Sequence, residues 1–130
     1  MASVQMEILE DLRVKGMNVE AWTDVSERWG GLGEYPSATD YLLVSLGACV
    51  LSLMGLKARA MRFDISGTSV DVEKIMTPTE RFEKIIVTVD CSRAIDRETA
   101  DKLERAAKGC PVHEVINVEQ EFNFKWNLSG

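Results

Sequence analysis

The stretch YLLVSLGACVLSLMGL, residues 41–56, decides the fold of this chain. It runs for sixteen residues without a charge and carries one cysteine, Cys49, near its middle. It is shorter than the roughly 18–20 apolar residues that a membrane-spanning helix needs and longer than the ~4–8 residues of a buried strand. We therefore predict a long helix that protein covers on all sides, with a thiol inside it.

The length of the chain limits how that helix is covered. With 130 residues, the sequence is most simply one domain, residues 1–130, which buries roughly two thirds of its unfolded surface. A long helix that is apolar all round needs more cover than so small a domain supplies. We therefore expect a second copy of the chain to complete the burial, as a homodimer with two-fold symmetry.

Composition argues against several classes of function. The apolar fraction of 45% and the charged fraction of 28% are those of a soluble globular protein. A formal net charge of −6 argues against nucleic-acid binding, which uses a basic face. The first residues do not show a basic start, an apolar run and a cleavage site. We therefore expect no signal peptide, and a cytoplasmic protein that has no membrane partner.

Hydrophobic patterns outside the apolar stretch predict strands and two further helices. Alternating apolar residues indicate the strands, and strong helix formers after Asp96 indicate a helix that Gly109 ends. No repeated strand–helix–strand unit appears, so we predict an α+β fold with largely antiparallel sheets around the long central helix. The expected elements are a hairpin within residues 1–24 with its turn at 15–18, a loop at 26–35, the central helix from 38 to 59 or 61, strands at 63–73 and 81–90, a helix at 96–108, a short helix from 110 and a strand at 117–127.

The start of the central helix carries a capping signal. Ser37 is followed three residues later by Asp40, a spacing at which the two side chains satisfy unpaired amides of the first turn. Asp40 lies nine residues before Cys49, which is about 2.5 turns and about 13 Å along the helix axis. Asp40 is therefore either a helix cap or, if the helix start bends, a partner of the thiol.

Three cysteines are present, and their spacing suits neither structural zinc nor a disulfide framework. Cys110 precedes Pro111 and so lies at a helix start, where the helix dipole lowers the pKa of a thiol and favours the reactive thiolate. The alternative for Cys110 is a small buried residue at a cap position. Cys91 follows a strand, and we expect it to be a surface or edge thiol.

Cys49 has two interpretations as well. It is either a small core residue or a nucleophile that a nearby positive charge activates, because apolar burial alone raises the pKa of a thiol. The sequence does not choose among the candidate cations, which are Arg13, Arg28, Lys57 and Arg59.

His113, the only histidine, follows Cys110 by three residues. A Cys–His pair for acyl transfer requires the two side chains to face each other, and no third orienting group is evident. A zinc site made from Cys49, Cys110, His113 and Asp40 lacks any recognisable ligand spacing. We therefore expect no metal and no cofactor.

Two motifs together resemble one known family. They are Pro–Ser–x–x–acid–x–Leu–Leu–x–x–Leu–Gly–Ala–Cys at residues 36–49 and Gly–Cys–Pro–Val–His at residues 109–113. With a buried helix between two strand pairs, they resemble the family of osmotically inducible protein C (OsmC) and organic hydroperoxide resistance protein (Ohr). The match is nearest to the less characterised OsmC-like branch, whose acidic residue before two leucines corresponds to Asp40.

This resemblance implies an OsmC-like fold, an intertwined homodimer and a thiol-dependent peroxidase of organic hydroperoxides. Cys49 would be the peroxidatic thiolate, which becomes a sulfenic acid, and Cys110 the resolving thiol, which forms a disulfide that an external dithiol reduces. The family's Arg–Glu pair would correspond to Asp40 with Arg13 or Arg28. The apolar surroundings of Cys49 favour alkyl or fatty-acid hydroperoxides as substrates.

Two other functions stay open. The fold can serve as a binding protein for a small apolar or sulfur-containing ligand, with cysteines that do not turn over. It can also be a structural dimer with inert thiols.

Overall fold

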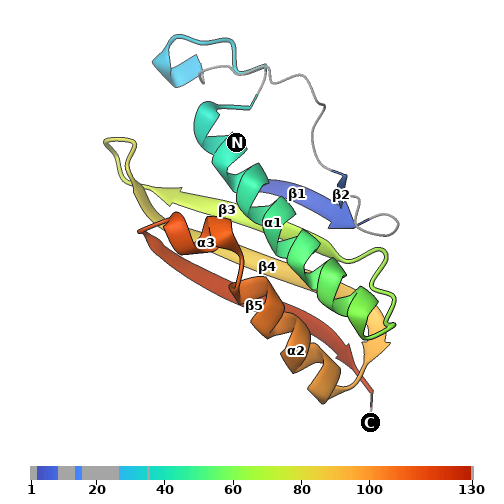
Figure 1. Cartoon of the computed structure of the whole chain (residues 1–130). Coiled ribbons are helices and arrows are strands. Elements are labelled where there is room, and N and C mark those ends of the chain that lie inside the picture. Colours follow the sequence, from blue (N-terminus) through green and yellow to red (C-terminus); the bar gives the residue numbers. More distant parts are fainter. Residues whose placement is uncertain (1–2, 9–13, 16–26, 35, 130) are drawn as a thin grey trace.

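The computed structural model describes residues 3–8, 14–15, 27–34 and 36–129. One five-stranded sheet, in the order β2-β1-β3-β4-β5, forms one layer. Three α-helices lie across one face of this sheet, as Figure 1 shows. In chain order the elements are β1 (Ser3–Ile8), β2 (Val14–Lys15), the 3-10 helix η1 (Glu27–Trp29), α1 (Ala38–Ala60), β3 (Ser69–Met76), β4 (Phe82–Ile95), α2 (Arg97–Lys108), α3 (Pro111–Val115) and β5 (Glu119–Leu128).

The central helix α1 forms where the sequence predicts it. Ser37 is its N-cap: the Asp40 amide donates to the Ser37 hydroxyl at 3.2 Å, and the Ser37 amide donates to the Asp40 carboxylate at 2.9 Å. The predicted capping box is therefore confirmed. The helix then runs without a break to Ala60 and is capped by Met61.

The sheet is mixed, which corrects the prediction of antiparallel sheets around the helix. The pairs β1–β2, β1–β3 and β3–β4 are antiparallel, but β4 and β5 run parallel. The two strands are parallel because α2 and α3 lie between them in the chain and carry it back to the start of β4 (Figure 1). In the described residues there is one sheet, on one side of α1, rather than sheets around it.

Three boundaries also differ from the sequence prediction. Lys15 belongs to β2 rather than to a turn, and the link from β1 to β2 lies outside the described residues. Residues 63–68 form a loop rather than a strand, with a turn at 66–67 where Gly67 has a φ of 87° that favours glycine. Strand β4 continues to Ile95 with a register shift between Cys91 and Ala94. A hairpin does form within residues 1–24, but it pairs β1 with Val14–Lys15, so the predicted turn at 15–18 is wrong; the helix that Gly109 caps is confirmed.

The core lies between the sheet and the helices. Inward residues of β3 and β4 alternate with outward ones, so that Val70, Val72, Ile85, Val87 and Val89 are buried against the helices. The fold thereby places one face of α1 on a well-packed layer.

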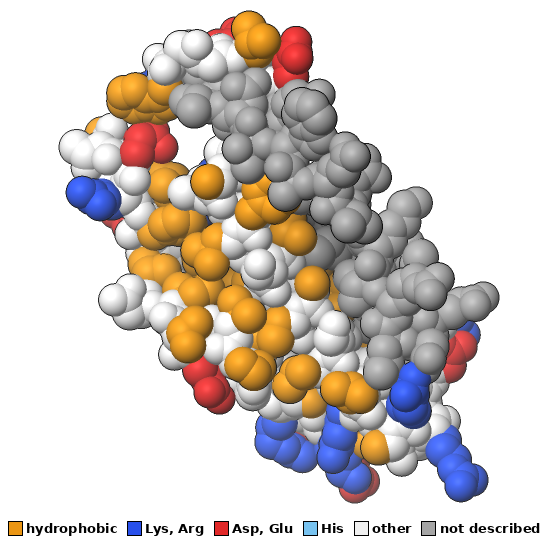
Figure 2. Space-filling view, turned by 45° about the horizontal axis from the view of Figure 1, so that its top comes forward, with side chains coloured by type: hydrophobic (Ala, Val, Ile, Leu, Met, Phe, Trp, Pro, Cys, Tyr) orange, Lys and Arg blue, Asp and Glu red, His pale blue; other side chains and the backbone are white. Residues whose placement is uncertain are grey.

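The opposite face of α1 is not fully covered. Of its most apolar 18 residues, 44% are buried inside the structure. Hydrophobic side chains gather over the middle of the helical face of the molecule, and Lys and Arg lie at its lower end (Figure 2). By length and composition α1 resembles a membrane span, but the core helix of a soluble protein passes the same test. The half-exposed or exposed apolar residues of α1 include Leu42, Val44, Ala48, Cys49, Leu53 and Leu56.

Candidate functional site: a pair of thiols between two helices

The structure brings two of the predicted site residues together. Cys49 lies in the middle of α1 on its half-exposed face, and Cys110 is the N-cap of α3, with no exposed surface. The Cys110 thiol hydrogen-bonds to the Cys49 sulfur, and both cysteines are free thiols. Residues 61 positions apart in sequence thus meet where α3 packs against α1.

Burial, with a further contribution from the hydrogen bond to Cys49, raises the pKa of Cys110 to about 11. The backbone amides of His113 and Val112, at the start of α3, oppose this rise but do not overcome it. The expectation that the helix start lowers this pKa is therefore wrong. A helix of five residues presents few aligned amides, and they do not offset the loss of water around a fully buried sulfur.

The ring of His113 is directed to β5 rather than to a cysteine. Its Nδ1 lies 2.7 Å from the Gln120 Oε1 atom, and the ring packs edge-on against Phe122 at 4.8 Å between centroids. Its link to Cys110 is made by the backbone, because the His113 amide donates to the Cys110 sulfur at 3.5 Å. The ring contacts therefore do not form the Cys–His pair that acyl transfer requires.

Asp40 takes part in a buried ion pair at the start of α1. Lys74 of β3 places its Nζ atom 2.9 Å from Asp40 Oδ1, 2.7 Å from Thr39 Oγ1 and 3.3 Å from Ser37 Oγ. Burial alone raises the pKa of the Asp40 carboxyl, but the Lys74 bond and the Ser37 amide outweigh it and hold that pKa below its usual value. Asp40 thus serves as a helix cap and as the counter-ion of Lys74.

Of the two predicted arginines, the structure describes only Arg28. Arg13 lies outside the described residues. Arg28 is in η1, with its guanidinium over the Trp29 ring at 5.0 Å and 3.8 Å from the Glu80 carboxylate. These contacts hold Arg28 at an exposed position near the β3–β4 turn and not at Cys49.

Cys91 differs from the sequence expectation. It lies on the inward face of β4 with 1% of its surface exposed, so it is a core residue rather than a surface or edge thiol. In the described residues, no group of three or more His, Cys, Asp and Glu side chains could hold a metal ion.

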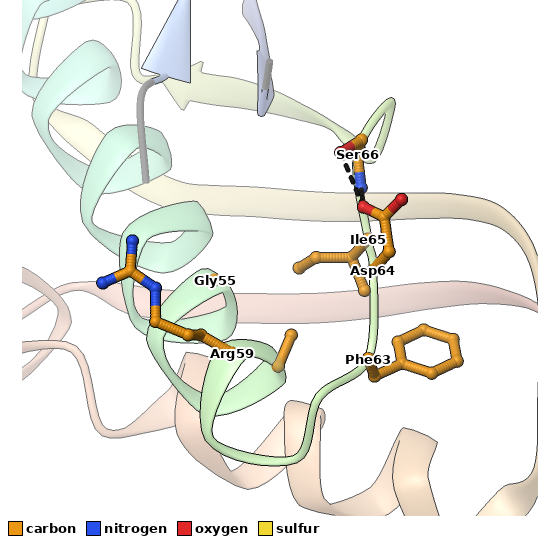
Figure 3. Close-up of a pocket in the computed structure, with 7 residues that line it drawn as sticks. Gly55, Arg59, Phe63, Asp64, Ile65 and Ser66 are labelled. Carbon is orange, nitrogen blue, oxygen red and sulfur yellow. Dashed lines mark hydrogen bonds between the residues drawn. The ribbon is translucent and has the colours of Figure 1, made fainter. Parts of the chain in front are cut away.

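A shallow pocket lies at the far end of α1, away from the thiols (Figure 3). It has a volume of about 130 Å³ and is lined by Gly55, Ala58, Arg59 and residues 63–66. Arg59 comes ten residues after Cys49, which is about 15 Å along the helix. The pocket therefore does not contain the sulfurs of Cys49 and Cys110.

Sequence reasoning missed Lys74 and Gln120, although each strand carries a signal for them. Lys74 continues the inward alternation of Val70 and Val72 on β3, and Gln120 opens the inward row of β5 that continues with Phe122. A polar residue in register with buried neighbours must find a polar partner on the element that covers it. That rule identifies both residues as candidates for contacts with the helices.

A mixed sheet with helices on one face and a thiol pair between two of them defines an α+β protein with a two-cysteine site. The OsmC-like protein family matches residues 31–125, and the chain belongs to this OsmC/Ohr family. The resemblance seen in the sequence is thus confirmed. Among the curated proteins, none matches the chain.

Several solved structures share the fold. A protein from Psychrobacter arcticus, provisionally described as an osmotic stress induced and detoxification response protein, is 29% identical with a TM-score of 0.73, and the match covers 95% of this chain and 96% of that one. An organic hydroperoxide resistance protein from Elizabethkingia anophelis is 18% identical with a TM-score of 0.65 over 98% and 97%. An organic hydroperoxide resistance protein OsmC from Legionella pneumophila is 13% identical with a TM-score of 0.60 over 100% and 98%.

Proposed function

We propose that this chain is a thiol-dependent peroxidase that reduces organic hydroperoxides through Cys49 and Cys110. The observation that carries the proposal is the hydrogen bond from the buried Cys110 thiol to the Cys49 sulfur. Membership of the OsmC/Ohr family supports it, because members of known structure are named for organic hydroperoxide resistance.

The hydrogen bond assigns different roles to the two sulfurs. Because its pKa is raised to about 11, the Cys110 thiol keeps its proton at neutral pH. It uses this proton to donate a hydrogen bond to the Cys49 sulfur. The thiolate is the nucleophilic form of a cysteine, so the raised pKa makes Cys110 the less reactive of the two sulfurs. Cys49 is also the more accessible of the two, since it lies on the half-exposed face of α1. Cys49 would therefore react with the hydroperoxide first.

The proposed reaction has two steps. The Cys49 thiolate attacks the terminal peroxide oxygen, the O–O bond breaks, and the alkoxide takes up a proton and leaves as the alcohol. Cys49 is then a sulfenic acid, oxidised by two electrons. The Cys110 sulfur next attacks the Cys49 sulfur, the S–S bond forms, and the hydroxide leaves as water with the proton that Cys110 gives up. An external dithiol then reduces the disulfide.

The exposed side of α1 suggests both the substrate class and the assembly. Leu53 is half-exposed and Leu56 has 49% of its surface exposed, on the same helix as Cys49. Apolar surface of this kind favours alkyl or fatty-acid hydroperoxides, because burial of the tail contributes roughly 25 cal/mol per Å². We also propose that a second copy of the chain covers much of this side, as an intertwined homodimer. We further propose a cytoplasmic setting, where thiols stay reduced.

A binding protein without turnover is the second candidate. The raised pKa of Cys110 favours it, because only about one thiol in 10⁴ is ionised at pH 7 when the pKa is about 11. Such a protein would form the Cys49–Cys110 bond once with an oxidant but would not cycle with a dithiol.

One experiment tests the proposal. The reduced protein is mixed with one equivalent of cumene hydroperoxide, and peptide mass spectrometry locates any new bond. We expect a Cys49–Cys110 disulfide within seconds and repeated turnover with a dithiol such as dihydrolipoamide. Cys110→Ser should stop at the Cys49 sulfenic acid and Cys49→Ser should not react.

Cys91→Ala is the matched control, because this third cysteine is buried away from the pair, and it should react as the original chain does. Thiols that stay unreacted after minutes would exclude the peroxidase. A disulfide that forms once without turnover would favour the binding protein.

A further inference from the structure

Gln120 lies at the first inward position of β5, and its side chain hydrogen-bonds to α3 and to the C-cap of that helix. Its side-chain amide donates to the His113 carbonyl at 3.0 Å and to the Ile116 carbonyl at 3.2 Å, and its Oε1 atom lies 2.7 Å from His113 Nδ1. Both carbonyls belong to the last turn of α3 or its C-cap, where helix carbonyls have no partner within the helix. Gln120 therefore caps α3 from a neighbouring strand.

These three contacts fix each other's direction. Because the amide nitrogen donates to two carbonyls, the Gln120 side chain cannot turn over without losing both bonds, so Oε1 must face His113. Oε1 only accepts hydrogen bonds, so the proton of the imidazole is on Nδ1. The side chain is thus held in one orientation by two acceptors, the His113 and Ile116 carbonyls, and by one donor, the His113 ring.

Helix α3 has little else to hold it in place. It is five residues long and none of those residues is buried. Only Cys110, at its N-cap, is fully buried, while Val112 and Ile116 pack partly against the core. Because burial of its own residues contributes little to holding α3 in place, the position of this helix depends strongly on the contacts that Gln120 makes. The position of Cys110 depends on α3 in turn.

We propose that Gln120 is a positioning residue, which acts through α3 to hold the Cys110 sulfur opposite Cys49. It touches neither sulfur, so its effect is on the closing of the disulfide and not on the attack on the peroxide. This inference rests on the proposed function only for its biological purpose. The effect of Gln120 is on the equilibrium constant for forming the Cys49–Cys110 disulfide, and it is expected with any oxidant.

The test measures the equilibrium constant for disulfide formation without any hydroperoxide. The reduced protein is equilibrated with oxidised and reduced glutathione, so that protein dithiol and glutathione disulfide give the Cys49–Cys110 disulfide and two glutathione thiols. The equilibrium constant is the effective concentration of one sulfur at the other. Gln120→Met, which has a side chain of similar length without hydrogen-bonding groups, should lower this effective concentration at least tenfold.

Asn123→Met is the matched control, because Asn123 is on the outward face of the same strand and bonds to Glu121. It should change the effective concentration less than twofold. An unchanged value in Gln120→Met, or an equal fall in both variants, would overturn the proposal. If Gln120→Met does not fold, Gln120→Glu replaces it: this variant keeps an acceptor for His113 but places a second acceptor against the two carbonyls, so a fall of at least tenfold is expected here too.

A second measurement separates positioning from general damage to the fold. In a Cys110→Ser background, Gln120→Met should leave the rate of Cys49 sulfenic acid formation by cumene hydroperoxide within twofold. A fall in this rate equal to the fall in effective concentration would show a general structural role. If no sulfenic acid forms even with Gln120 in place, the proposed peroxidase fails, while the glutathione result still decides the role of Gln120.

Discussion

Two buried polar contacts join α1 to other elements, and the pKa of the buried group is shifted in opposite directions in the two contacts. At the start of α1, Asp40 is fully buried yet its pKa is lowered, because Lys74 and the Ser37 amide both donate to it. Near the middle of α1, the neighbouring Cys110 is fully buried and its pKa is raised to about 11, chiefly because burial disfavours the charged thiolate, and the hydrogen bond to Cys49 acts in the same direction. Burial raises the pKa of both groups, and only at Asp40 do the neighbours donate enough hydrogen bonds to the charged form to reverse the shift.

The difference separates a contact that holds the fold from one suited to chemistry. A buried ion pair is costly to break, because either partner left alone is an uncompensated charge. A buried Cys110 thiol that keeps its proton carries no charge, so its replacement leaves no uncompensated charge behind. The predictions below test this contrast, from the largest expected effect to the smallest.

Asp40→Asn should lower the free energy of unfolding by about 2–4 kcal/mol, since it leaves the Lys74 ammonium, with 12% of its side chain exposed, without its counter-ion. Urea unfolding at pH 7 measures the loss. The double variant Asp40→Asn/Lys74→Met should lose less than Asp40→Asn alone. A double variant that is less stable than either single variant would contradict the ion-pair interpretation.

The same substitution has a defined pH dependence. Because the folded pKa of Asp40 lies below its usual value of 3.8, the charged carboxylate stabilises the folded state at pH values above 3.8. The gap in stability between the original chain and Asp40→Asn should therefore persist down to about pH 4 and close as the pH falls further.

The thiol pair should respond to alkaline pH instead. Cys110 has a folded pKa of about 11 against a usual 9.0, so its contribution to stability is present below pH 9 and is lost as the pH rises from 9 to 11. Under reducing conditions, the original chain should lose on the order of 1–2 kcal/mol relative to Cys110→Ala between pH 8 and pH 10. Equal losses in both proteins would show that Cys110 is not the group responsible.

Thr39→Val tests the hydroxyl of Thr39 in the ion-pair cluster. It removes the 2.7 Å bond from the Lys74 ammonium and the 2.9 Å bond between the Thr39 and Ser37 hydroxyls, but it leaves the bonds of Lys74 to Asp40 and Ser37. We expect a loss of about 0.5–1 kcal/mol in urea unfolding. A loss as large as that of Asp40→Asn would mean that Thr39, rather than Asp40, is the main partner of Lys74.

Arg28→Ala should have the smallest effect. Arg28 is 66% exposed and its closest approach to Glu80 is 3.8 Å, so the pair contributes less than about 0.5 kcal/mol. Because its contacts join it to Glu80 and Trp29, we also expect the rate of Cys49 oxidation to change less than twofold. A tenfold slower oxidation would restore Arg28 as the activating cation that the sequence suggested.

The features that could be predicted from the sequence are those with local signals. The capping box at Ser37 and the stop at Gly109 each depend on residues within one helical turn, and both form as expected. The pairing of Cys49 with Cys110 was accessible through the family resemblance, because the motifs around both cysteines are intact.

Features set by distant elements were not accessible in the same way. Whether β5 pairs parallel or antiparallel with β4 depends on which edge the chain reaches after α3, and local alternation does not encode that. The partner of Asp40 comes from β3, and the sign of the Cys110 pKa shift depends on burial by α1. Each required the position of a second element relative to the first.

The register of β1 against β3 has a consequence for how the chain folds. Ser3 pairs with Glu73 and Glu7 with Ser69, so these two strands meet across more than sixty residues of chain that include all of α1. The hairpin of β3 and β4 is local by comparison and can form early. Folding rates fall as the sequence separation of contacts rises. We therefore expect β1 to join the sheet last, and a chain still being synthesised to leave the β3 edge open until then.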